Sequence, residues 1–185
     1  MINYFLITKE KNLDIRTFED FLYTFLFTYE FEVYPNFYLV KYKDSEVSVK
    51  DALNSYIFDL SLNSRIYIGQ NNNEDDFKVD LKYLLNHFNN TLKDIFYDKK
   101  SLLFELIKEK NDIDLEFVIK DYKNDYSMQQ TLISFFMHNM NVVKTSKDLY
   151  LHRNTLINKL DRFKEKTGFD PKEFRDAYIL YSILN

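Results

Sequence analysis

Cysteine is absent from this 185-residue sequence, and glycine and proline occur only twice each. Without cysteine the chain has no disulfide bonds, no thiolate nucleophile and no cysteine-ligated zinc finger, and its composition fits a reducing compartment. Because glycine and proline are so scarce, long flexible linkers are not expected. Most of the chain should form regular helices and strands.

Long hydrophobic runs are missing as well. The sequence does not open on a basic segment followed by an apolar stretch, and no apolar run reaches the length of a membrane span. We therefore expect a cytoplasmic protein that does not associate with membranes. The chain is instead rich in aromatic residues, with 18 Phe and 15 Tyr, which supply enough apolar area for one large domain or two small ones.

The most informative segment is a pair of short helical patterns separated by a turn. The first pattern runs from Val142 to Leu149, and Ser146 supplies the small side chain that two closely crossing helices need. The second pattern starts near His152. The spacing predicts a helix-turn-helix whose apolar residues share one buried seam, namely Leu149, Leu151, Leu156, Leu160 and Phe163.

The opposite face of the second pattern is polar and cationic. It carries Arg153, Thr155, Asn158, Lys159 and Arg162. Arginine and lysine neutralise phosphates or pair with guanine, and asparagine pairs with the edge of adenine. A helix with this face exposed fits the major groove of DNA.

The segment from Gln129 to Leu184 resembles the C-terminal helix-turn-helix domain of the PucR/CdaR family of bacterial transcriptional regulators. Two departures from the family pattern concern Asn158, where the family usually has Tyr, and Lys159, where Arg is common, so the preferred base sequence could differ. The matching residues are Thr131, Leu132, Phe135, Phe136, Asn139, Asn141, Leu149 to Leu156 with the string His-Arg-Asn-Thr-Leu, Leu160, Arg162, Thr167 and Gly168.

This resemblance implies a sequence-specific DNA-binding transcriptional regulator whose partner is double-stranded DNA. A looser similarity to the DNA-binding helices of the Fis nucleoid protein implies a recognition helix that begins near His152, within a motif of about residues 142–166. The residues expected to bind DNA are His152, Arg153, Asn154, Thr155, Asn158, Lys159 and Arg162.

Several of these residues also have a purely structural interpretation. His152 precedes the helix, so the role of helix N-cap is slightly favoured over a base contact. Lys164 and Lys166 are interpreted as a solvated helix face with Asp161 and Glu165 as partners at helical spacing. The apolar residues upstream are expected to form core or a dimer seam: Met128, Phe135, Phe136 and Met140.

The end of the sequence carries clear helix punctuation. Gly168 is expected to end the second helix in a left-handed conformation, and Asp170 and Pro171 are expected to start the last helix as N-cap and first residue. The apolar face of that helix should close the core while Lys172, Glu173 and Asp176 stay in water. This face consists of Phe174, Ala177, Tyr178, Tyr181 and Leu184.

Charge is divided unequally along the chain, whose formal net charge is −4. From Ser127 to Asn185 nine Lys and Arg stand against six Asp and Glu, a net of +3, whereas Met1 to Tyr126 carries −7. The positive charge therefore accompanies the motif. Since +3 is modest, a single copy should bind DNA weakly, and we expect a homodimer.

The fold class is predicted to be α+β, with a small α/β domain over residues 1–98 and an all-α helix-turn-helix region over residues 99–185. The first domain is expected to serve in dimerisation or sensing. Its elements should follow in the order hairpin, helix, strand, helix. Its expected elements are a strand at Ile2–Ile7, a hairpin around Pro35 and Asn36, a helix at Val49–Leu60, a strand at Arg65–Ile68 ended by Gly69, and a helix at about Phe77–Tyr97.

This order is similar to the second half of a GGDEF-like domain, but Tyr34-Pro35-Asn36-Phe37 lacks the glycines and acidic pair that a diguanylate cyclase carries. We therefore predict a degenerate scaffold, no catalytic residues, no metal and no cofactor. The effector stays unknown. The alternative function is a protein-interaction or scaffold module that keeps the helix-turn-helix without binding DNA.

Overall fold

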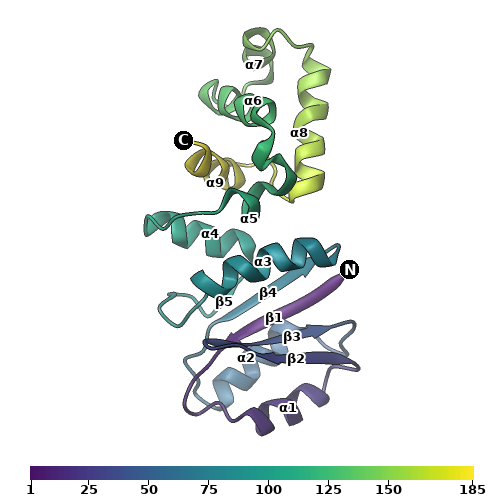
Figure 1. Cartoon of the computed structure of the whole chain (residues 1–185), viewed down its shortest axis with the longest axis vertical. Helices are drawn as coiled ribbons and strands as arrows, with labels where there is room; N and C mark the ends of the chain where they lie inside the picture. Colours follow the sequence, from purple (N-terminus) through teal and green to yellow (C-terminus); the bar gives the residue numbers. More distant parts are fainter. The chain divides into compact units, whose positions relative to one another are not determined.

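The computed structural model describes all residues from 1 to 185. The chain divides into two compact units, which we call the N-terminal unit, Met1–Leu102, and the C-terminal unit, Leu103–Asn185 (Figure 1). The first combines a sheet with helices and the second is helical. The predicted α+β class is confirmed.

A five-stranded sheet forms the centre of the N-terminal unit. The strand order is β2-β3-β1-β4-β5, with antiparallel pairing except between β4 and β5, which run parallel. The middle strand is nearly buried, as its apolar sequence predicts. The bounds are β1 Ile2–Thr8, β2 Tyr29–Val33, β3 Phe37–Tyr42, β4 Ile66–Asn71 and β5 Phe96–Tyr97.

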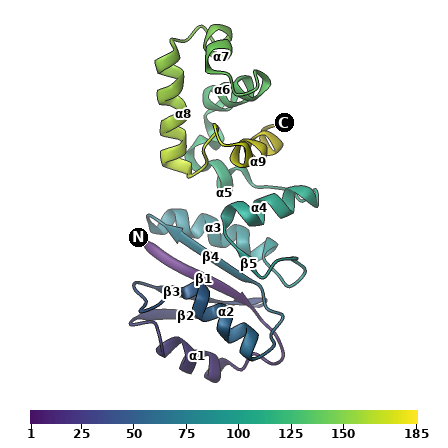
Figure 2. The same cartoon turned by 180° about the vertical axis from the view of Figure 1, so that it is seen from behind.

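Helices cover both faces of this sheet (Figures 1 and 2). One core joins the sheet to α1, Ile15–Tyr23, through Phe18, and to α2, Val49–Asp59, through Leu53. On the other face α3, Glu74–His87, places Phe77 edge-on against Tyr4 at 5.0 Å between ring centroids. The three helices begin at side-chain N-caps, which are Asp14, Ser48 and Asn73.

Gly69 does not end its strand, contrary to the sequence-based expectation. β4 runs on to Asn71, and Gly69 pairs with Tyr4 of β1 in the ladder. A Cβ atom at this position would overlap the ring of Tyr4, which is fully buried and whose hydroxyl donates to Asp80 Oδ2 at 3.2 Å. The absence of a Cβ atom at Gly69 therefore allows the Tyr4 side chain to approach closely, which local sequence cannot reveal.

The expected long helix to Tyr97 is also wrong in its extent. α3 ends at His87, because Phe88 turns to an extended conformation and inserts into the core, where its ring lies 6.1 Å from Phe37. Tyr97 then pairs beside β4 as part of β5. The strand at Ile2, the hairpin around Pro35 and the helix at Val49 are confirmed.

The helices of the C-terminal unit follow one another through short turns. Those that precede the motif are α4 Lys99–Lys108, which spans the division between the units, α5 Leu115–Ile119, the 3₁₀ helix η1 Lys120–Asn124 and α6 Tyr126–Met137. Three more follow, α7 Val142–Asp148, α8 Arg153–Thr167 and α9 Phe174–Leu184. α6 packs against α7 and α9, and α7 packs against α8.

The last helix differs from its prediction in both its start and its buried face. α9 begins at Phe174, because Pro171 lies in a turn and the Asp170 carboxylate accepts from the Lys172 backbone N–H instead of capping a helix. Phe174 and Tyr181 are exposed, whereas Asp176 is buried and accepts from the Asp170 backbone N–H at 2.8 Å. The core-facing apolar residues are Ala177, Ile179 and Leu180.

The two glycines should respond differently to alanine. Gly69→Ala forces a methyl group into the Tyr4 ring, and we expect the free energy of unfolding to fall by about 1–3 kcal/mol. Gly168 has φ +81° with open space around its Cβ position, so Gly168→Ala should cost about 1 kcal/mol through backbone strain alone. Urea denaturation measures both.

The control is Gly168→Asn, which tolerates the left-handed conformation and should lose less than Gly168→Ala. Wild-type stability of Gly69→Ala would show that the Tyr4 ring can move aside and that close approach is not the reason for the glycine.

Candidate nucleic-acid interface

The first helix of the motif, α7, is short and held at both ends. The Asn141 side chain caps it, accepting from the backbone N–H groups of Val143 and Lys144 at 3.0 Å each. Ser146 is buried, as expected where helices approach closely. No acidic residue lies in the first turn. The structure therefore has the first half of the predicted helix-turn-helix in place.

The turn between the two helices contains a left-handed tyrosine. Tyr150 has φ +52°, and its neighbour Leu151 donates its N–H to the Ser146 carbonyl at 2.8 Å, which closes the turn. The Tyr150 side chain is 96% exposed. Because the ring is exposed, no hydrophobic burial offsets the backbone strain that a positive φ imposes on this tyrosine.

His152 acts as the N-cap of α8. Its Nδ1 accepts from the Asn154 backbone N–H at 3.3 Å, which is the structural role that the sequence slightly favoured. The imidazole stays exposed. His152 therefore fixes where the helix begins and presents its ring beside the first turn.

The buried seam of α8 is formed by Leu156, Leu160 and Phe163, which are fully buried. Leu149 and Leu151 are only half-buried, so the predicted seam holds for the helix and weakens in the turn. Each fully buried leucine or phenylalanine contributes roughly 1.5–3 kcal/mol of transfer free energy. This anchoring sets which side of the helix faces solvent.

Most of the residues predicted to bind DNA are exposed, and they lie at the N-cap, in the first two turns of α8 and at Arg162. Lys159 is only half-buried, with its Nζ 3.5 Å from Thr131 Oγ1 on α6, so it lies between the two faces. Arg153 and Arg162 make no ion pair with a carboxylate, and the first turn of α8 contains no acidic residue. The exposed members are His152, Arg153, Asn154, Thr155, Asn158 and Arg162.

The C-terminal end of α8 is electrostatically different, because Lys164, one of the two lysines in its last turn, is paired. Lys164 Nζ lies 2.7 Å from Asp170 Oδ2, and Lys172 Nζ lies 2.6 Å from Asp161 Oδ1. The expected pairing of Lys164 with Asp161 or Glu165 along the helix is therefore not what forms. Asp170 follows the Gly168 cap, and the reversal of the chain brings its carboxylate back to the helix.

The pair shifts both pKa values. The hydrogen bond to Asp170 raises the pKa of Lys164. Burial alone would raise the pKa of Asp170, but the hydrogen bonds from Lys164 Nζ and the Lys172 backbone N–H outweigh burial and hold that pKa below its ordinary value. The pair thus joins the end of α8 to the turn before α9.

A comparison with family models matches residues 128–185 to the PucR C-terminal helix-turn-helix domain. Residues 128–185 are a domain of this family. The match covers α7, the turn and α8 with their supporting helices, as the quoted residues predicted. The similarity of the N-terminal unit to a GGDEF-like domain stays a prediction.

Two curated proteins are similar to parts of the chain. The Carbohydrate diacid regulator of Escherichia coli is 41% identical over 66 residues, which cover 36% of this chain and 17% of that protein. Uncharacterized protein YxkF of Bacillus subtilis is 34% identical over 87 residues, which cover 44% of this chain and 28% of that protein. The matched segments thus span less than a third of either relative.

One solved structure resembles the chain over nearly its whole length. The Regulator of Polyketide Synthase Expression from Bifidobacterium adolescentis aligns with a TM-score of 0.50 and 18% identity, covering 99% of this chain and 79% of that one. This likeness concerns the fold. None of the helices combines the length and apolar character of a membrane span.

The sequence analysis assigned no role to Tyr150, which the structure places in the turn, exposed and with a positive φ. The motif analysis treated the segment around it as a turn and assigned roles only from His152 onward. The signal that could have found it is a tyrosine at a turn position where glycine is usual. Its positive φ and its exposure became visible only in the structure.

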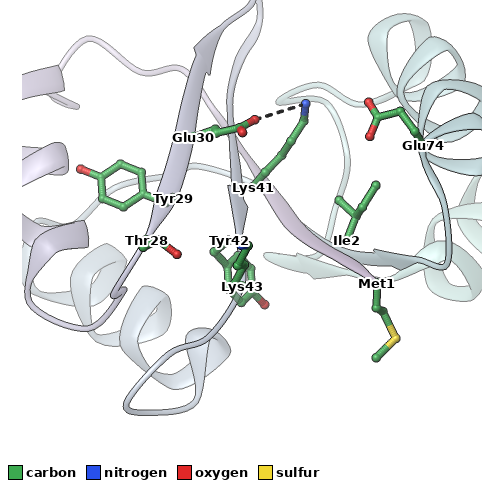
Figure 3. Close-up of a pocket in the computed structure, with 9 residues that line it drawn as sticks. All are labelled: Met1, Ile2, Thr28, Tyr29, Glu30, Lys41, Tyr42, Lys43 and Glu74. Atoms are coloured by element: carbon green, nitrogen blue, oxygen red, sulfur yellow. Dashed lines mark ion pairs between the residues drawn. The ribbon is translucent and has the colours of Figure 1, made fainter.

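The N-terminal unit has an open pocket of about 620 Å³ between the sheet and the start of α3 (Figure 3). Lys41 stands at its centre, with Nζ 3.1 Å from Glu32 and 3.7 Å from Glu30, and Glu74 lies across the pocket. Burial would lower the pKa of Lys41, but these carboxylates raise it. The central cation is therefore already neutralised. No group of three metal-ligating side chains is present in the described chain.

The ion pair at the end of α8 should make stability depend on acid pH. Asp170→Asn keeps the shape but removes the charge, and we expect the free energy of unfolding at pH 7 to fall by about 1 kcal/mol. Since the folded pKa of Asp170 is lowered, the contribution is present above the unfolded pKa of about 4 and is lost as pH falls through the folded value. Urea denaturation at pH 7 and pH 3 measures it.

The control is Asp161→Asn, whose pair with Lys172 is exposed on both sides and should contribute less. If the loss of unfolding free energy in Asp170→Asn were the same at pH 7 and pH 3, the effect would come from packing and not from charge.

Proposed function

We propose that this chain is a sequence-specific DNA-binding transcriptional regulator in which the first half of α8 enters the major groove. The observation that carries the proposal is the exposed, unpaired cationic surface at the start of α8, inside a domain of the PucR family. The organism of the relatives and the absence of a membrane-spanning helix fit action on DNA in a bacterial cytoplasm.

The electrostatics of α8 favour DNA at its N-terminal end. Arg153 and Arg162 are free of carboxylates, and the first turn adds the positive end of the helix dipole without an acidic residue to cancel it. At the other end Lys164 is committed to Asp170. Arg153 thus carries an unpaired charge at the end of α8 where a recognition helix meets phosphates and base edges.

The exposed polar residues supply the base contacts in this proposal. Asn154, Thr155 and Asn158 can hydrogen-bond base edges, and Arg153 can pair with guanine through its two-pronged guanidinium group. Arg162, two turns further on, is assigned to phosphate. His152 stays an N-cap whose exposed ring can also meet the backbone, and Lys159 would leave Thr131 to reach DNA.

Tyr150 extends this surface into the turn. Its side chain is 96% exposed, and it lies two residues before His152, the N-cap of α8. Tyrosine hydroxyls are frequent donors to DNA phosphates. We assign Tyr150 to the sugar-phosphate backbone at the edge of the groove.

The protein should act as a homodimer, because the C-terminal segment carries only +3 and two half-sites read together bind far more tightly than one. The N-terminal unit is the candidate for sensing or dimerisation. One relative is named for a carbohydrate diacid, but Lys41 in the N-terminal pocket is already paired. A diacid effector is therefore not carried over to this chain.

The alternative is a protein-interaction module that keeps the helix-turn-helix shape without DNA. The acidic first half of the chain favours that alternative. Salt-dependent binding to duplex DNA separates the two, because only phosphate contacts give a steep dependence on salt.

Arg153→Ala should weaken binding to mixed-sequence duplex DNA by about tenfold and reduce the salt slope by about one. Lys159→Ala should have a smaller effect, because Lys159 leans towards Thr131. Fluorescence anisotropy over a range of salt concentrations measures both affinity and slope.

The matched control is Arg175→Ala, which removes the same charge from the exposed surface of α9. Equal affinities of the Arg153→Ala and Arg175→Ala variants for DNA would reject the assignment of α8 as recognition helix. Wild-type protein that fails to bind duplex at low salt would favour the interaction module.

Tyr150→Gly should separate stability from binding. It removes a left-handed L-residue that costs roughly 1–2 kcal/mol, so thermal stability should be kept or raised. DNA affinity should fall by about three- to tenfold, the weight of one hydrogen bond. Thermal denaturation and anisotropy measure the two effects.

Tyr150→Phe keeps the ring and the strain but lacks the hydroxyl, and it should lose nearly as much DNA affinity as Tyr150→Gly. Full DNA affinity in both variants would show that the exposed tyrosine has no part in DNA binding.

A further inference from the structure

The C-terminal unit carries an apolar groove between α6 and α9. Its volume is about 410 Å³. Two of the side chains around it are strongly exposed, Phe174 at 77% and Met137 at 65%. It is lined by Phe136, Met137, Asn139, Met140, Phe174, Ala177, Tyr178 and Tyr181.

This groove exists because α9 turns its aromatic stripe outward. Asp176, Ile179 and Leu180 point into the core, so Phe174, Tyr178 and Tyr181 are left on the solvent side. Ring-to-ring contacts support part of this stripe, with Phe136 to Tyr181 at 6.2 Å and Phe104 to Tyr178 at 5.6 Å between ring centroids. A contiguous exposed apolar surface of this kind commonly marks an interaction site.

The groove does not compete with the proposed DNA surface. The start of α8 lies at the opposite end of the C-terminal unit from α9 in both views (Figures 1 and 2). The groove lining contains none of the residues assigned to DNA. A molecule bound in the groove would therefore leave the recognition helix free.

We propose that a second copy of this chain docks on the groove, so that two PucR-type domains pair through α6 and α9. This rests on the proposed function, since pairing brings two recognition helices onto one DNA. The lining has no charged residue, so two identical surfaces can meet about a twofold axis without like-charge repulsion. Charged partners of other kinds would find no complementary group there.

The surface also has the two shapes that a self-complementary contact requires. Phe174 projects at the rim, and the 410 Å³ hollow beside it is large enough for a phenylalanine side chain. About a twofold axis, Phe174 of each copy can fill the groove of the other. Aromatic anchors in such hollows supply most of the binding energy of interfaces.

The size of the surface predicts a weak dimer. With roughly 150–250 Å² for each fully buried aromatic side chain, the exposed parts of Phe174, Tyr178, Tyr181 and Met137 offer about 400 Å² for each copy. Stable dimers bury about 800 Å² per partner. We therefore infer pairing that is slight in free solution and strengthened when both copies lie on the same duplex, where their effective concentration is high.

The absence of cysteine allows a direct test by crosslinking. The full chain with Met137→Cys, which keeps the Phe174 anchor, is treated with a short bismaleimide, with and without a mixed-sequence duplex long enough for two copies. The control is Phe58→Cys, 81% exposed on α2 of the N-terminal unit. We expect crosslinked dimer from Met137→Cys at a yield at least fivefold above the control, increased further by DNA. Equal yields would overturn the proposal.

A second measurement uses charge in place of the crosslinker. Phe174→Glu combined with Met137→Glu should weaken self-association at least tenfold by sedimentation equilibrium, with Phe58→Glu as control. Both substituted side chains are exposed, so the fold should survive, and circular dichroism checks this. Self-association unchanged by the double substitution would overturn the proposal, as would a wild-type protein that stays monomeric on DNA.

The two proposals fail separately. If the wild-type protein pairs through the groove but does not bind duplex, the DNA function is wrong and the pairing surface stands. If Met137→Cys gives no excess crosslinking while Arg153→Ala still weakens DNA binding, the pairing surface is wrong and the DNA function stands.

Discussion

The burial of one face of α8 is the constraint on which the candidate interface depends. Leu156, Leu160 and Phe163 are fully enclosed, and a helix held by three such side chains cannot rotate without exposing them. Their positions dictate that Arg153, Asn154 and Asn158 point to solvent. The His152 cap and the Gly168 terminus fix the two ends of the helix, so the exposed surface has a defined length as well as a defined direction.

Whether a basic residue of α8 has a carboxylate partner depends on the segment that flanks that end of the helix. At the C-terminal end the chain reverses after Gly168 and returns a carboxylate to Lys164. At the N-terminal end the tight turn after α7 brings no acidic side chain within reach of Arg153. At the C-terminal end of α8 the pair stabilises the fold, whereas at the N-terminal end, which we call the open end, Arg153 has no carboxylate partner. The open end is the one that the DNA proposal uses, with Tyr150 beside it in a conformation that tyrosine rarely adopts.

The N-terminal unit likewise combines tightly packed sheet faces with one open pocket. Aromatic rings fill both faces, and Gly69 lets the Tyr4 ring pack directly on the neighbouring strand. The pocket near Lys41 is open, but its central cation is shared between Glu30 and Glu32. In the C-terminal unit the corresponding free surface is the uncharged groove on α9. A regulator built in this way would read DNA with one surface and pair through another.

Local sequence signals were enough to predict the buried strand at Ile2, the hairpin at Pro35, the helix-turn-helix and the end of α8 at Gly168. The spacing also predicted which face of α8 is exposed, because its apolar residues recur on one side of the helix only. The packing of the folded unit was needed to show that α9 buries Ile179 and Leu180 in place of Tyr178 and Tyr181. Apolar residues lie all around that helix, so their spacing cannot choose between its faces. The tertiary structure alone decided the partner of Lys164 and the purpose of Gly69, because both depend on atoms that the chain brings together only after folding.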